Sequence, residues 1–87
     1  MTGELEQIIN GITARLPKVQ YRQLAVAHPG DDDGLWFFRL PGREEEVQIE
    51  SSTGKCPFLI EGDGHHERRV GATVKDVVSV VVEWLSG

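Results

Sequence analysis

The sequence predicts an α+β fold: a two-layer sandwich made of a helix, a four-stranded antiparallel meander and a second helix, with both helices on one face of the sheet. Apolar residues recur at helical spacing near both ends of the chain and alternate with polar residues between them. Short turn-like segments join the alternating stretches. At 87 residues the chain has room for one domain, 1–87, which would bury about 60–65% of its unfolded surface.

The first helix is predicted from an apolar stripe at helical spacing, formed by Leu5, Ile8, Ile9, Ile12 and Leu16. Pro17 ends this helix, because the residue before a proline is pushed out of helical conformation. Gly11 is its weak point, since glycine inside a helix costs about 1 kcal/mol relative to alanine.

Four strands are predicted between the helices, over residues 19–28, 35–40, 46–50 and 58–60. In the first strand the alternation changes phase near Arg22 and Gln23, which indicates a bulge or a late start. Segments rich in glycine, proline, serine and acidic residues separate the strands. Because the connections are of hairpin length, antiparallel pairing is favoured over parallel pairing.

The last segment is ambiguous by propensity, because its many valines are β-branched and suit strands. Its period is helical, however, as the spacing of Val74, Val77, Val78, Val81, Val82 and Leu85 shows. Thr73 followed by Asp76 resembles a capping box, with Asp in place of the usual Glu or Gln. We therefore predict a helix packed on the sheet, with a terminal strand as the alternative.

Net charge, cysteine count and the lengths of the apolar runs indicate which partners and which cellular location to expect. The net charge of −5 and the pI near 5.0 argue against nucleic acid, whose binding requires clustered Lys and Arg. Cys56 is the single cysteine, which excludes a disulfide framework and favours a reducing compartment. No apolar run approaches the roughly 20 residues that span a bilayer, and the amino terminus does not resemble a signal peptide. The expectation is a cytoplasmic protein without a membrane partner.

The run Leu35-Trp36-Phe37-Phe38 indicates association, because successive side chains on a strand point to opposite faces and both faces are then apolar. If Trp36 and Phe38 face the helices, the other face carries Leu35 and Phe37. The residues predicted to bind protein are Leu35, Phe37, Arg39 and Leu59. Two alternatives stay open, namely burial of these side chains under the chain's own loops and the reverse phase of the strand.

A competing site involves Asp63, His65, His66 and Glu67, which are typical metal ligands within five residues of the chain. Cys56 belongs to the same alternative, since the charge of the neighbouring Lys55 can lower a thiol pKa and favour a nucleophile. Adjacent histidines on a strand point apart, however, so we expect a solvated hairpin tip and a structural cysteine. We predict no catalytic residue, no metal and no cofactor.

Together these observations predict a small non-enzymatic adaptor of bacterial type that binds protein through the open face of its sheet. Its partner is another protein or a second copy of the chain. The order of elements is similar to that of small acidic secretion chaperones and immunity proteins, a likeness of architecture that carries no residue motif. A small enzyme or a metal-dependent site at Asp63, His65, His66 and Cys56 is the alternative.

Overall fold

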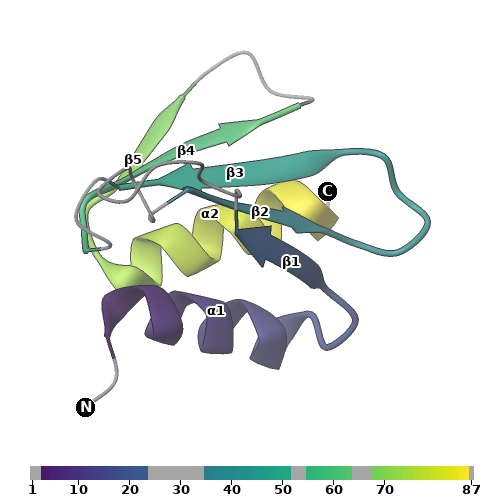
Figure 1. Ribbon diagram of the computed structural model, residues 1–87, viewed down its shortest axis with the longest axis horizontal. Coiled ribbons are helices and arrows are strands. Elements are labelled where there is room, and N and C mark those ends of the chain that lie inside the picture. Colours follow the sequence, from purple (N-terminus) through teal and green to yellow (C-terminus); the bar gives the residue numbers. More distant parts are fainter. Residues whose placement is uncertain (1–2, 24–34, 52–54, 64–67, 87) are drawn as a thin grey trace.

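The computed structural model describes residues 3–23, 35–51, 55–63 and 68–86, and two helices lie on the same side of one antiparallel sheet (Figure 1). The elements are α1 (Glu4–Arg15), β1 (Gln20–Gln23), β2 (Leu35–Arg39), β3 (Glu46–Glu50), β4 (Phe58–Gly62), β5 (Arg69–Gly71) and α2 (Val74–Ser86). The strands lie side by side in chain order, and each pairs antiparallel with the next. The predicted α+β class with an antiparallel meander is confirmed.

The predicted number of strands is wrong, because β5 adds a fifth strand to the sheet. β5 is three residues long, and only Val70 among them has a strong preference for strands, so no alternating pattern indicates it. Backbone pairing with β4 and packing on α2 hold it in place. Of the first predicted strand, 19–28, the structure describes β1, and residues from 24 onward lie outside the described part of the chain.

The carboxyl-terminal segment is a helix, as its period predicts, and the alternative of a terminal strand is wrong. The backbone N–H of Asp76 donates to Thr73 Oγ1 at 3.1 Å, which is the predicted cap at the amino end of α2. The buried residues of this helix are Val77, Val78, Val81, Trp84 and Leu85. In the described part of the chain, no helix is long and apolar enough to cross a membrane.

The two helices pack closely where Gly11 of α1 meets Val78 of α2. A Cβ atom at Gly11 would lie 2.9 Å from Val78 Cγ2, which is too close unless the Val78 side chain or one helix shifts. The glycine is therefore more than a weak point in α1, because it allows this approach. α2 lies directly against β3, β4 and β5, whereas α1 packs mainly against α2.

One hydrophobic core fills the space between the helices and the sheet. Its largest fully buried side chains are Phe38, Phe58, Ile8, Ile12, Ile49, Ile60, Val77 and Val81. Those that come from strands share one face, since Phe38 pairs with Val47 and Ile49 pairs with both Trp36 and Ile60. We call this the covered face of the sheet.

The turn between β2 and β3 connects the sheet to the end of α2. Gly42 has φ of 81°, and the N–H of Arg43 donates to the carbonyl oxygen of Leu40 at 3.2 Å, an arrangement typical of a Pro-Gly turn. Arg43 Nη1 then donates to the carbonyl oxygen of Leu85 at 2.8 Å. A cation at this end of a helix satisfies a free carbonyl and complements the helix dipole.

Candidate functional site

The face of the sheet opposite the helices carries the residues predicted to bind protein, and we call it the open face. The strand register arranges its side chains in three rows across the sheet. The rows are Leu35, Glu50, Leu59 and Val70; Arg22, Phe37, Gln48 and Glu61; and Gln20, Arg39 and Glu46. Leu35, Phe37, Arg39 and Leu59 therefore lie on one face, and the reverse phase of the second strand is wrong. A binding role for these residues stays a prediction.

The apolar residues of the open face differ in exposure. Leu35, Phe37 and Leu59 are half-buried. Val70, which pairs with Leu59 at the edge of the sheet, is 68% exposed. Sequence reasoning missed Val70 because it did not predict β5. The apolar row of the open face thus extends to an exposed edge strand.

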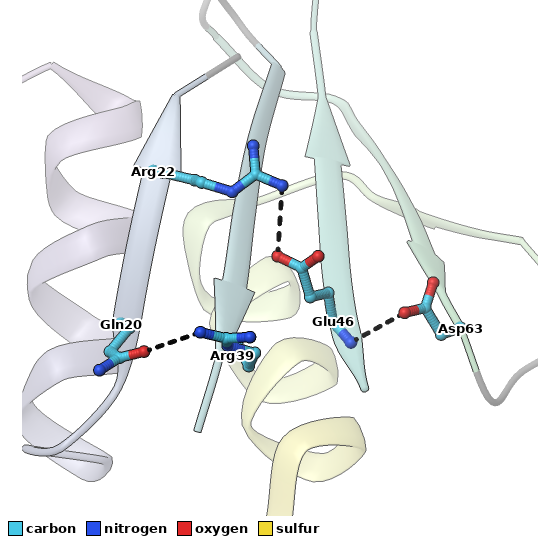
Figure 2. Close-up of polar contacts among 5 residues, drawn as sticks. All are labelled: Gln20, Arg22, Arg39, Glu46 and Asp63. Atoms are coloured by element: carbon cyan, nitrogen blue, oxygen red, sulfur yellow. Dashed lines mark hydrogen bonds and ion pairs between the residues drawn. The ribbon is translucent and has the colours of Figure 1, made fainter. Parts of the chain in front are cut away.

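Arg22 covers part of the Phe37 ring. Its guanidinium carbon lies 4.4 Å from the ring centroid, within the range of a cation–π contact. From there Arg22 Nη2 lies 3.6 Å from Glu46 Oε2, so the side chain crosses β2 toward β3 (Figure 2). Sequence reasoning missed this residue because the phase of the first predicted strand changes at this point.

Polar contacts hold the neighbouring side chains in place. Arg39 Nη2 donates to Gln20 Oε1 at 3.3 Å, between β2 and β1 (Figure 2). The backbone N–H of Glu46 donates to Asp63 Oδ2 at 3.1 Å, which connects the start of β3 to the end of β4. The carboxylate of Asp63 therefore has a structural role at the edge of the open face.

Charge is unevenly distributed over the open face. Among the described strand residues, the cations of this face, Arg22 and Arg39, lie on β1 and β2, whereas the carboxylates, Glu46, Glu50 and Glu61, lie on β3 and β4. Beyond the strands, Arg68 Nε lies 3.3 Å from Glu61 Oε1 in an exposed ion pair. The open face is therefore basic on its β1–β2 half and acidic on its β3–β4 half.

Two shallow hollows flank Phe37. One has a volume of about 190 Å³ and is lined by Gln20, Tyr21, Arg22, Phe37, Arg39 and Glu46. The other has a volume of about 110 Å³ and is lined by Phe37, Glu46, Gln48, Glu61, Gly62 and Asp63. Sites for small molecules have roughly 300–1,000 Å³, so these hollows suit single side chains of a protein surface better than a substrate or cofactor.

The structure does not bring Asp63 and Cys56 together. They flank β4 at opposite ends, and its five residues span about 17 Å at a rise of about 3.3 Å per residue. His65, His66 and Glu67 lie outside the described residues. Among the residues that are described, no three metal-ligating side chains gather in one place.

Cys56 lies in an environment that opposes a thiolate. Burial, then a hydrogen bond with Glu4 and the charges of Glu4 and Asp76, raise the pKa of the Cys56 thiol to about 11. The suggestion that Lys55 lowers this pKa is therefore wrong. A thiol with a pKa this high is protonated at neutral pH and is a poor nucleophile.

Comparisons of this chain with protein-family models, with curated proteins and with solved structures each give no significant match. The geometry and charge of the open face are therefore the features that indicate a function.

Proposed function

We propose that this chain is a non-enzymatic module that binds protein through the open face of its sheet. Leu35, Phe37, Arg39 and Leu59 are the contact residues of this proposal, and Val70 extends the contact to the sheet edge. The observation that carries it is the register, which aligns apolar side chains on the face that the helices leave free. A reducing compartment such as the cytoplasm of a bacterial cell fits the single cysteine.

The open face has apolar side chains that the helices do not cover. An aromatic side chain has about 150–250 Å² to bury, so Phe37 with its apolar neighbours approaches the few hundred Å² at which an apolar patch indicates an interaction site. The polar residues around it, Arg39, Gln48 and Glu50, resemble the rim of a protein interface. A partner would therefore gain from burying the apolar row and from pairing with the rim.

Three observations favour binding over catalysis. The hollows beside Phe37 are shallow. The pKa of the Cys56 thiol is raised, which opposes nucleophilic chemistry. Asp63 already accepts a backbone hydrogen bond and lies far along β4 from Cys56. These support a surface whose function is recognition.

The test replaces Phe37 by glutamate. Phe37→Glu should leave the far-ultraviolet circular dichroism unchanged and abolish the complex that the wild-type chain forms in extracts of its host or with itself. The matched control is Ala14→Glu, which adds the same charge at an exposed position of α1, on the helix side of the molecule. If the Phe37→Glu chain stays folded and keeps every complex of the wild type, the proposed binding face is wrong.

A further inference from the structure

We infer that the open face binds the open face of a second copy of this chain, in a homodimer whose twofold axis runs along the strands between β2 and β3. This inference rests on the proposed function, since it assigns an occupant to the same surface. The observation behind it is the division of the open face into a basic half and an acidic half.

The charge division follows the strands, although Glu46 and Glu61 also have exposed ion-pair partners in the same chain, Arg22 and Arg68. On the open face of β1 and β2 the described residues include two arginines and no carboxylate, and on β3 and β4 they include three glutamates and no cation. Figure 2 shows Arg22 and Arg39 on the β1–β2 side and Glu46 on β3. A surface of this kind is complementary to a copy of itself that is turned so that each half meets the opposite half.

Two axes place such faces against each other with their strands aligned. When the same surface of both copies forms the contact, the twofold axis lies in the plane of the interface. An axis across the strands would oppose Arg22 to Arg22 of the second copy and Glu61 to Glu61 of the second copy. An axis along the strands, between β2 and β3, opposes Arg39 to Glu46 of the second copy and Arg22 to Glu61 of the second copy. Of these two axes, only the one along the strands brings unlike charges together.

The same axis joins the apolar residues of β2. Neighbouring strands lie about 4.8 Å apart, so β2 of each copy is about 2.4 Å from an axis between β2 and β3. The two Phe37 rings then lie about 5 Å apart sideways, while packed sheets are about 10 Å apart and their side chains interdigitate. The rings therefore meet across the axis, with Leu35 of each copy further along the same strand.

The area of the contact indicates that this dimer is weak. About this axis four strands of each copy overlap, because β5 lies beyond β1 of the second copy. Four strands about 4.8 Å apart and about five residues long, at about 3.3 Å per residue, cover roughly 300 Å² on each copy. The total of roughly 600 Å² is below the roughly 1,200–2,000 Å² of stable complexes. The dimer is therefore weak, and it dissociates on dilution.

The test exchanges charges at Arg39 and Glu46, which are cross-strand neighbours and which oppose each other between copies. Sedimentation velocity over a concentration series would compare the wild-type chain, Arg39→Glu, Glu46→Arg, an equimolar mixture of these two variants, and the double variant. Each single variant places like charges against each other in its homodimer and should associate at least about tenfold more weakly than the wild type. The mixture should recover association, because an acidic open face then meets a basic one.

The mixture is also the control for folding. Misfolding of either single variant would lower its own association, but mixing two misfolded chains would not restore it. The double variant, in which the two charges trade places, should associate like the wild type. Added salt should weaken the wild-type dimer, because exposed charges are screened over about 10 Å at 0.1 M.

Three outcomes would contradict the inference. A stronger dimer of Glu46→Arg would indicate the axis across the strands, which brings position 46 against Glu50 of the second copy. Failure of the mixture to recover would show that these charges do not meet. A chain that stays monomeric at roughly 1 mM would contradict self-association, because its binding free energy would then be no more than about 4 kcal/mol. A host protein bound by this monomer and lost with Phe37→Glu would still support the proposed function.

Discussion

The covered and open faces of the sheet use the same strand for different purposes. On β2, Phe38 points to the helices and is fully buried, whereas its neighbour Phe37 points to the open face and is half-buried beneath Arg22. The covered face is apolar throughout its centre, while the open face alternates apolar and charged residues. Packing requirements explain the apolar residues of the covered face. They do not explain a large aromatic residue on the open face, and this is why we assign binding to it.

The largest expected effect comes from placing a charge on each face in turn. Phe38→Glu should unfold the domain, because an unpaired carboxylate would enter a fully buried site of the core. Phe37→Glu should lower the free energy of unfolding by only about 1–2 kcal/mol, through the loss of a half-buried ring. Urea denaturation followed by circular dichroism measures both. Equal destabilisation by the two variants would remove the distinction between the faces.

A charge on α2 tests the covered face from the side of the helix. Val81 is fully buried in the core, so Val81→Asp should cost several kcal/mol or unfold the domain. Lys75→Asp is the control, since Lys75 is exposed on the first turn of the same helix, where a carboxylate complements the dipole. Thermal unfolding should separate the two variants clearly. Similar melting temperatures would mean that α2 does not pack through Val81.

A smaller effect is expected where the helices behind the covered face meet. Gly11→Ala should destabilise the domain by about 1–3 kcal/mol, because the new methyl group would press on Val78 and outweigh the better helix propensity of alanine. In the double variant Gly11→Ala/Val78→Ala the methyl group gains space, so it should be less harmful there than in the wild-type background. A double-mutant cycle from urea denaturation measures this coupling. If Gly11→Ala stabilises the domain instead, the helix propensity of alanine outweighs the contact with Val78.

The smallest expected effect concerns reactivity and leaves the fold unchanged. With a pKa near 11 instead of 9.0, the Cys56 thiolate is about 100-fold less populated at neutral pH, and the greater nucleophilicity of a high-pKa thiolate recovers up to about tenfold. Alkylation by iodoacetamide should therefore be about tenfold slower than in the unfolded chain and should rise with pH until near 11.

Glu4→Gln should speed this alkylation, because the carboxylate of Glu4 contributes to the raised pKa of Cys56. Glu6→Gln, at an exposed position of the same helical turn, should not. Equal rates for the folded and unfolded chains would mean that Cys56 is an ordinary surface thiol.

Sequence reasoning predicted the elements that carry a strong periodic signal. Both helices and the strands β2, β3 and β4 follow from the spacing of apolar residues, since burial of one stripe or one face requires that spacing. The alternation of Val47 and Ile49 with polar neighbours also indicated which residues of β2 turn away from the helices. β5 has no such signal, because three residues are too few to show alternation and their pairing partner lies elsewhere in the chain.

By itself, the sequence determined the fold class and the two helical stripes, and it predicted one face for Leu35, Phe37 and Leu59 with the reverse phase of β2 left open. Only the tertiary structure decided the closeness of α1 and α2 at Gly11, the cover of Phe37 by Arg22 and the exposure of Val70. The physical reason is the separation in sequence of the residues that interact. Periodicity reports which side of an element is buried, and this is local information. Contacts across strands and between helices depend on register and on the distance between elements, which arise only when the whole chain packs.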